Sequence, residues 1–240
     1  MSAETAPARA PHRVAILQSS YIPWKGYFDI AHEVDTFVFY DDVQFTHRDW
    51  RSRNRVKTAS GAEWLSVPVG GTRERLIFEV ELPDARWQVR HWRTLQQAYG
   101  RTPHFERYRD YFEHVYLGTT WTHLAELNQS MTKHIATEFL GLRTRFEDSR
   151  RYAAQGHKLD RLVDLASKAG ATQYLSGPSA RSYIDPARFA EAGIELRWKD
   201  YGGYPEYPQR FAPFVHQVTV LDLLFNVGPD APHFIWGWRG

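Results

Sequence analysis

Residues 14–42 read VAILQSSYIPWKGYFDIAHEVDTFVFYDD, and this stretch decides the fold. Its first four residues are apolar and predict a buried strand. A polar loop follows, and apolar positions at helical spacing then predict a short helix over about residues 25–33. A second apolar run, residues 36–40, predicts another strand. The order strand, helix, strand is a βαβ unit, which implies parallel strands joined by a right-handed crossover.

The rest of the chain extends this pattern. Residues 43–57 are polar and basic, and residues 64–69 and 77–82 have the alternation or β-branching of strands. Helical spacing dominates from about 85 to 140, and the later α–β–α–β order again indicates a parallel sheet. We therefore predict a single α/β domain over residues 13–240, with a mostly parallel sheet of Rossmann-like type and a helical insertion at about 85–140. The Ala- and Pro-rich residues 1–12 are predicted to be a disordered leader.

The composition excludes several classes of protein. The 240 residues include no cysteine, which excludes disulfide frameworks, thiolate nucleophiles, cysteine-based zinc sites and iron–sulfur clusters. The formal net charge is only +2, so charge alone does not indicate polyanion binding. No apolar run approaches the roughly 20 residues that span a bilayer, and we expect a cytoplasmic protein. The aromatic content of 15%, with 9 Trp, favours flat or amphipathic ligands such as sugars and bases.

The loop between the first strand and the first helix is the strongest candidate ligand site. A polar loop that enters a helix at Gly26 can present backbone N–H groups to an anion, and ligands of open α/β sheets bind at such strand ends. The side chains expected to line it are Gln18, Tyr21 and Trp24. An ordinary βα turn, with Pro23 and Gly26 as breakers, explains the pattern equally well.

Charged side chains follow the second strand. Asp41 and Asp42 could take up a proton, accept a substrate hydroxyl or hold a divalent cation, whereas helix capping or solvated charge is the alternative. The basic run after them could grip phosphate by charge and bidentate geometry, and a solvated loop is its alternative. The candidate binding residues in this run are Gln44, Arg53, Asn54, Arg55 and Lys57.

Two further candidates lie on a helix and at a strand end. His91 follows Trp87 by one helical turn, and it is either a general base or a hydrogen-bonded helix histidine. Ser176 ends a predicted strand beside Gly177, where a second ligand loop and a plain turn both fit. The histidines have no metal-ligand spacing, so we predict no metal site.

The last candidates lie near the C-terminus. Tyr207 and Gln209 belong to an aromatic, proline-broken loop, which is either a lid or sugar platform or a self-packed surface loop. Asp222 and Asn226 share one face of an otherwise apolar helix. A polar pair in that position is costly unless satisfied, so it either caps buried backbone or points into a site.

Several segments together resemble the WbqC-like family of bacterial proteins. They occur in the family's order and are VAILQSSYIPWKGYF (14–28), FYDDVQF (39–45), Trp50, RNRVK (53–57), WLSVPV (64–69), YLSG (174–177) and LDLLFNVG (221–228). One departure is visible: members usually read Gln-Pro, often after a histidine, where this chain has Gln18–Ser19 after Leu17. The family is associated with O-antigen and related glycan or natural-product gene clusters.

The resemblance implies a transferase that forms an amide by moving a glycyl or other aminoacyl group to the amine of an amino sugar, commonly on a nucleotide sugar. Asp41 or Asp42 would accept the amine proton, because only the neutral amine is nucleophilic. The donor stays open between an amino acid used with ATP and Mg²⁺ and a charged tRNA. The alternatives are a nucleotide- or glycan-binding protein without chemistry, an RNA-binding protein and an inactive scaffold. We also expect six rings to form the walls of one site: Tyr21, Trp24, Tyr27, Tyr40, Trp50 and Trp64.

Overall fold

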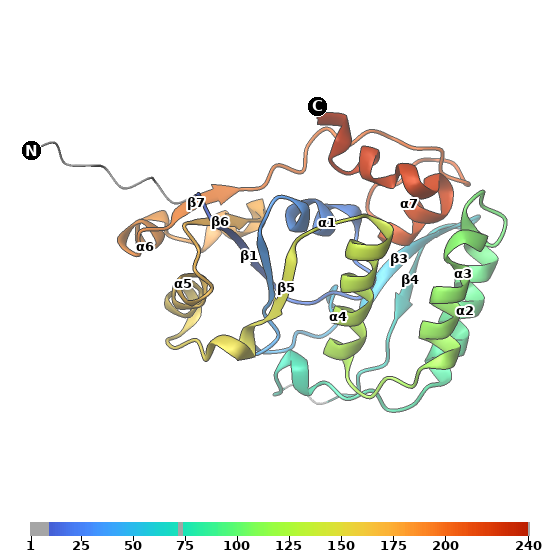
Figure 1. Cartoon of the computed structure of the whole chain (residues 1–240). Coiled ribbons are helices and arrows are strands. Elements are labelled where there is room, and N and C mark those ends of the chain that lie inside the picture. The colour runs from blue at the N-terminus through green and yellow to red at the C-terminus, as the bar shows by residue number, and fades with distance from the viewer. Residues whose placement is uncertain (1–9, 72–73, 240) are drawn as a thin grey trace, which may run out of the picture.

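One parallel sheet of five strands organises the molecule, in the order β5-β2-β1-β6-β7 (Figure 1). The computed structural model describes residues 10–71 and 74–239. The strands are β1 (Arg13–Leu17), β2 (Thr36–Phe39), β5 (Arg145–Asp148), β6 (Gln173–Ser176) and β7 (Glu195–Trp198). All neighbouring strands pair in parallel, which confirms the predicted fold class. Numbered in chain order, the strands have the order 3-2-1-4-5, which matches the first five positions of the Rossmann order 3-2-1-4-5-6.

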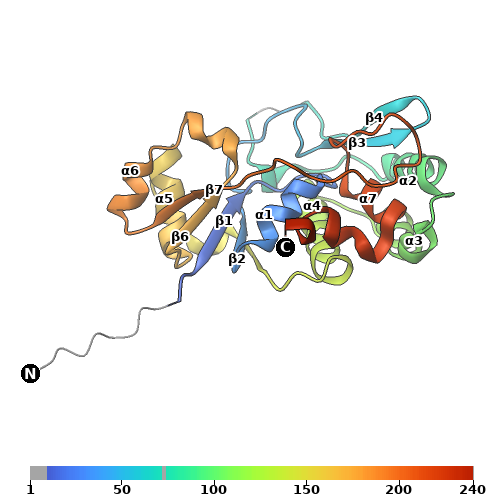
Figure 2. The ribbon, with the colours of Figure 1, turned by 90° about the horizontal axis from the view of Figure 1, so that it is seen from above.

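Helices cover both faces of this sheet, because successive side chains of a strand point to opposite faces. Ala15 and Phe37 join the core formed with α1 (Lys25–His32), whereas Val14 and Val38 join the core formed with α5 and α6. The bounds of these two helices are Lys158–Lys168 and Pro186–Glu191. Figure 2 shows α5 and α6 on one side of the sheet and α1 on the other. Strands that are buried on both faces explain the continuous apolar runs in the sequence.

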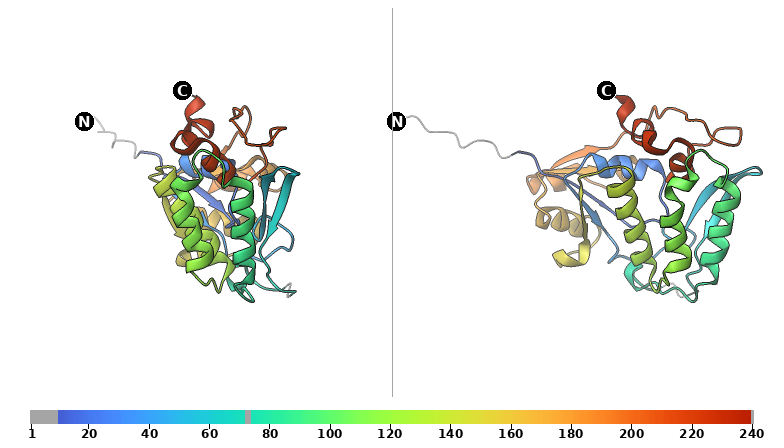
Figure 3. Two further views of the ribbon diagram at one scale, coloured as in Figure 1. Left: turned by 90° about the vertical axis from the view of Figure 1, so that its right-hand side faces the viewer. Right: turned by 45° about the vertical axis from the view of Figure 1, so that its right-hand side comes forward.

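The segment between β2 and β5 adds a hairpin and three helices. The hairpin is β3 (Arg53–Thr58) and β4 (Gly61–Ser66), and the helices are α2 (Arg86–Tyr99), α3 (Phe105–Glu113) and α4 (Leu124–His134). These helices stand next to one another, with the hairpin against α2 (Figure 3). The C-terminal helix α7 (Val220–Val227) packs on α3 through Phe225, which contacts the rings of Tyr99 and Phe105.

One local prediction is wrong, and one stretch holds a strand that was not predicted from the sequence. Residues 77–82, expected as a strand, begin with a single 3-10 turn, Ile77–Glu79, because the Glu79 carboxylate accepts a hydrogen bond from the N–H of Leu76 at 2.8 Å. The basic run, for which a solvated loop was the alternative, contains β3, in which buried Asn54 and Val56 alternate with half-buried arginines. The alternation with a period of two that is typical of a strand was present in this run, but the charged side chains made it hard to recognise.

The predicted leader falls mostly on residues 1–9, which lie outside the described residues. Its last residue, His12, is held in place: its N–H donates to Thr172 Oγ1 at 2.8 Å, and its carbonyl accepts from the N–H groups of Thr172 and Gln173. His12 therefore extends the pairing between β1 and β6. Within the described residues, no helix has both the length and the apolar character needed to cross a bilayer.

Candidate functional site

A cavity of about 1320 Å³ opens at the carboxyl edge of the sheet. Its walls come from the segments after β1, β2 and β6 and from the start of α5. Along the chain, β2 is added beside β1 and β5 beside β2. The next strand, β6, then lies on the other side of β1. The crevice at such a topological switch point is where open α/β sheets bind ligands. The volume suits a ligand larger than a single sugar or amino acid.

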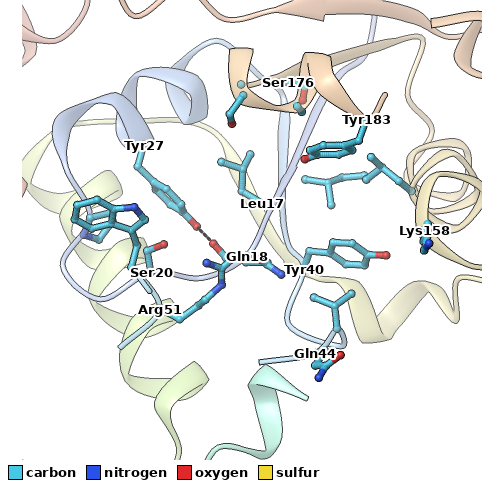
Figure 4. Close-up of a pocket in the computed structure, with 18 of the residues that line it drawn as sticks. Leu17, Gln18, Ser20, Tyr27, Tyr40, Gln44, Arg51, Lys158, Ser176 and Tyr183 are labelled. Carbon is cyan, nitrogen blue, oxygen red and sulfur yellow. Dashed lines mark hydrogen bonds between the residues drawn. The ribbon is translucent and has the colours of Figure 1, made fainter. Parts of the chain in front are cut away.

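The loop after β1 forms the wall beside α1 (Figure 4). Tyr27 on α1 donates its hydroxyl hydrogen to the carbonyl oxygen of Gln18 at 3.0 Å, and Ser20 and Arg51 lie next to this pair. Arg51 forms an ion pair with Asp49. This wall therefore combines an aromatic ring, hydrogen-bonding groups and one guanidinium.

The side chain of Asn54 on β3 holds the same loop in place. The Asn54 side-chain amide donates to the carbonyl oxygens of Tyr21 at 3.1 Å and Ile22 at 2.9 Å, and it accepts from the N–H of Arg55. Ile22 has a φ of 36°, which is a strained conformation for a β-branched residue. The hydrogen bonds to Asn54 help to maintain that conformation, so the loop is preorganised.

The opposite wall is the start of α5. His157 occupies the N-cap position but makes no side-chain capping hydrogen bond, so α5 presents backbone N–H groups near the cavity. Lys158 begins the helix, and the rings of Tyr40 and Tyr183 lie on the same side of the cavity (Figure 4). A helix N-terminus with a lysine favours an anion, and tyrosine rings favour a flat group.

Asp42 is the single carboxylate among the cavity residues in the described part of the chain, which also include Arg51, Lys158 and Arg161. Its Oδ2 pairs with Arg161 on α5 at 2.5 Å, and its Oδ1 accepts a hydrogen bond from Ser149. Arg161 pairs with Asp42 and Arg51 pairs with Asp49, whereas Lys158 has no ion pair among the described residues, and this free charge makes the cavity attractive to anions.

Asp41, the other predicted acid, does not line the cavity. Its carboxylate is fully buried, where it accepts from the N–H of Ser19 at 2.9 Å and from Gln129 Nε2 on α4 at 2.8 Å. Burial raises the pKa of this carboxyl above its ordinary value, although the hydrogen bonds from Gln129 and Ser19 oppose the shift. Asp41 therefore ties the loop after β1 to α4 and does not face a ligand there.

His91, on α2, and Tyr21 also lie away from the cavity, in the core. The Tyr21 hydroxyl hydrogen bonds to His91 Nδ1 at 2.7 Å and to the Tyr116 hydroxyl at 2.6 Å. Burial lowers the pKa of His91 to about 4, so the ring is neutral at physiological pH. The packing of His91 against Trp87 explains their one-turn spacing. Of the two readings of His91, the hydrogen-bonded helix histidine matches this environment.

The C-terminal candidates form a separate buried cluster. Asp222 Oδ1 accepts from the Tyr207 hydroxyl at 2.6 Å and from Gln209 Nε2 at 2.8 Å, while Asn226 Nδ2 donates to the Asp222 carbonyl at 2.7 Å. Burial raises the pKa of Asp222, and these partners counter the shift. The cluster attaches the 201–217 loop to α7, and its members are absent from the cavity walls.

Some side chains of the basic run lie near the surface, and others lie in the core. Arg53 and Arg55 lie over the ring of Trp64, with guanidinium-to-centroid distances of 4.2 and 5.6 Å. Lys57 is buried, and its Nζ donates to the Pro213 carbonyl at 2.6 Å. None of the three lines the cavity, because β3 turns their side chains to the other side of the hairpin from Asn54.

Six of the predicted site residues do line the cavity: Gln18, Trp24, Asp42, Gln44, Asn54 and Ser176. Of the six rings expected to converge, Trp24, Tyr27, Tyr40 and Trp50 line it, whereas Tyr21 is in the core and Trp64 packs on the outer side of Trp50. The prediction missed Lys158, Arg161 and Tyr183. The sequence did carry one signal for Lys158 and Arg161, since both lie at the start of the helix that follows a parallel strand.

No group of three or more acidic or histidine side chains able to hold a metal ion occurs in the described ranges. Asp42 is the one acidic side chain that the cavity walls, as far as they are described, would offer to a cation, and it is already paired with Arg161.

Two of the comparisons with known proteins found a match. The model of the WbqC-like protein family matches residues 18–234. The chain is 44% identical over 225 residues to the uncharacterized protein Rv1507c of Mycobacterium tuberculosis, a match that covers 93% of this chain and 97% of that protein. No solved structure matches the chain. The family match spans both the cavity loops and α7, and the chain belongs to the WbqC-like protein family.

Proposed function

We propose that this chain is a biosynthetic transferase that forms an amide, by aminoacyl transfer of the glycyl type, on the amine of an amino sugar carried by a nucleotide. The observation that carries the proposal is the cavity at the β1/β6 switch point, with the uncapped start of α5 and Lys158 on one wall. A large, net basic cavity with tyrosine rings suits a ligand that joins phosphates, a base and a sugar. Glycan or natural-product biosynthesis is the setting that the family suggests.

The two walls suggest how the substrates divide. The phosphates of a nucleotide sugar would lie at the start of α5 beside Lys158, with the base against Tyr40 or Tyr183. The sugar would then extend over Leu17 toward Gln18 and the wall beside α1. The acyl donor would enter from the side of Trp50 and Arg51, which both line the cavity.

Asp42 is the candidate proton acceptor. The neutral amine attacks the acyl carbonyl carbon, a C–N bond forms, and the bond from that carbon to the leaving oxygen breaks. The amine proton passes to Asp42 and from there to the leaving oxygen. Arg161 and Ser149 orient the carboxylate for this transfer.

Two donors are compatible with this chemistry. A free amino acid would need activation by ATP with Mg²⁺, which in proteins is bound through one or two carboxylates together with phosphates. The single cavity carboxylate found within the described residues, Asp42, is engaged by Arg161, so the donor set is poor for magnesium. An aminoacyl-tRNA ester needs no further activation, and we favour it as the donor.

The test combines binding and turnover. Titration calorimetry with a panel of amino-sugar nucleotides should give binding, and incubation with an acceptor and a charged tRNA should add one aminoacyl group to its mass. Asp42→Asn should keep most of the affinity and lose most of the transfer. Asp110→Asn, the same substitution at an exposed position of α3, is the matched control and should leave both unchanged. Failure of every nucleotide sugar to bind would overturn the proposal.

The alternative is a nucleotide- or glycan-binding protein without chemistry. The observation in its favour is that Asp42, the cavity's single carboxylate in the part of the chain described, already has two partners. In that case nucleotide sugars bind with wild-type affinity to Asp42→Asn, and no donor gives a mass gain with either protein.

A further inference from the structure

Two tryptophans are exposed next to the mouth of the cavity. Trp50 and Trp64 are each 45% exposed, and their ring centroids are 5.3 Å apart. Arg53 and Arg55 lie over the Trp64 ring, and Trp64 stands opposite Arg55 in the β3–β4 register. We call these four residues the Trp–Arg strip. It is continuous with the cavity, because Trp50 is also a cavity residue.

The two arginines of the strip have no acidic partner in the part of the chain that the structure describes. Across the described ranges, the guanidinium groups of Arg53 and Arg55 form no ion pair and no hydrogen bond, and the Nε atom of each is buried without a partner. Arginines elsewhere do pair: Arg188 contacts Asp160, and Arg109 contacts Glu106. The strip therefore has two uncompensated positive charges on an exposed aromatic surface.

We infer that the Trp–Arg strip binds the single-stranded 3′ end of an RNA. Single-stranded nucleic acids are bound by aromatic rings on which bases stack, together with basic groups that follow the phosphates. A neutral glycan would account for the exposed rings but not for two arginines without acidic partners. The strip has both components on one hairpin, next to a cavity in which an acyl group carried by that RNA would react.

This inference deepens the proposed function and rests on it for the identity of the RNA as an acyl donor. The aminoacyl ester at the RNA end would pass Trp50 into the cavity, where the sugar amine attacks its carbonyl carbon. The C–O ester bond breaks as the C–N bond forms, and the released ribose oxygen takes the proton that left the amine. RNA binding by the strip itself needs no transfer activity and can be measured alone.

The experiment is fluorescence anisotropy of a labelled single-stranded RNA that ends in CCA, measured over about 50–200 mM salt with the full chain. Trp64→Ala should weaken binding by about tenfold, since one base can no longer stack on the ring. Trp64→Phe should recover part of the affinity. The double variant Arg53→Gln/Arg55→Gln should reduce the slope of log K against log salt by about 0.7 for each phosphate that the variant no longer neutralises.

Arg188→Gln, on α6 at the far side of the sheet, is the matched control and should leave both affinity and slope unchanged (Figure 1). Equal RNA affinity in the wild type and the strip variants would overturn the inference, as would a neutral oligosaccharide that binds in a Trp64-dependent manner when RNA does not. Nucleotide-sugar titrations of the same variants report separately on the cavity. If they stay normal while RNA fails to bind, the inference falls and the proposed function stands.

Discussion

Asp41 and Asp42 are adjacent in sequence, yet their carboxylates belong to different environments. The Asp41 carboxylate is enclosed between the N–H of Ser19 and the amide of Gln129, whereas the Asp42 carboxylate lines the cavity and pairs with Arg161. The alternation of a strand end explains the division, because consecutive side chains point to opposite faces. One acid holds the loop after β1 in place, and the other lines the cavity.

Replacing Asp41 by alanine should destabilise the fold by about 2–4 kcal/mol, because it leaves the buried Ser19 N–H without its acceptor and removes one of the two carboxylates, Asp41 and Asp148, to which the Gln129 amide donates. Urea unfolding followed by circular dichroism measures this change. The equivalent substitution at exposed Asp110 should change the unfolding free energy by less than about 0.5 kcal/mol.

The substitution Asp41→Asn tests the negative charge of the Asp41 side chain separately from its shape. Burial raises the pKa of Asp41, so its ionised form opposes folding, and the wild type gains stability as the pH falls through this raised value. Asparagine has no such titration. The wild type should therefore gain stability relative to Asp41→Asn as the pH is lowered from 7 toward the ordinary aspartate value. A constant difference between the two proteins over that range would contradict the assignment of the shift to Asp41.

His91 should have the opposite pH dependence. Its pKa is about 4 in the folded protein and 6.5 ordinarily, so its contribution is fully present above pH 6.5 and is lost as the pH falls toward 4. The loss amounts to about 3 kcal/mol when each pKa unit is taken as 1.36 kcal/mol. His91→Gln should remove this slope from the unfolding free energy. His114→Gln, at an exposed histidine, should retain it.

The course of the chain was predictable from its periodicity, but the pairing of the strands was not. Val14 to Leu17 and Thr36 to Phe39 are apolar because both faces of their strands are buried, and this pattern is visible without coordinates. That β6 returns to the other side of β1 depends on long-range contacts, which leave no local signature. The switch point therefore could not be located from the sequence, although Lys158 does open a helix that follows a parallel strand.

The site residues divide for a related reason. Gln18, Asp42 and Ser176 were found because they follow apolar runs, and carboxyl ends of parallel strands meet at one edge. His91 and Asp222 were selected by residue type and helical spacing, and neither criterion separates a buried, satisfied polar group from one that faces a cavity. His91 is hydrogen bonded to Tyr21, which is far away in sequence. Asp222 is hydrogen bonded to Tyr207, which lies in a proline-rich loop.

Lys158→Gln should weaken binding of a nucleotide sugar by about tenfold, because it removes the positive charge at the uncapped start of α5. The loss should shrink at high salt, as expected for a partly exposed charge. Titration calorimetry at two salt concentrations measures both effects. Lys168→Gln changes the same residue type at the other end of the helix, where Lys168 pairs with Asp164, and should leave the affinity unchanged. An equal loss in the two variants would mean that net charge, and not the start of α5, attracts the ligand.

Asn54→Asp should disrupt the preorganised loop with almost no change in side-chain shape. A carboxylate at this buried position would face the carbonyl oxygens of Tyr21 and Ile22 in place of the amide that now donates to both. We expect a loss of about 3–5 kcal/mol in unfolding free energy at pH 7, together with weaker binding of nucleotide sugars, since Asn54 also lines the cavity. The loss should diminish at acidic pH, because a protonated carboxyl can donate one of the two hydrogen bonds again. Urea unfolding of Asn54→Asp and Asn54→Ala at neutral and acidic pH tests this account. Recovery at low pH in the aspartate variant alone supports the loop anchor, and an identical pH response of the two variants refutes it.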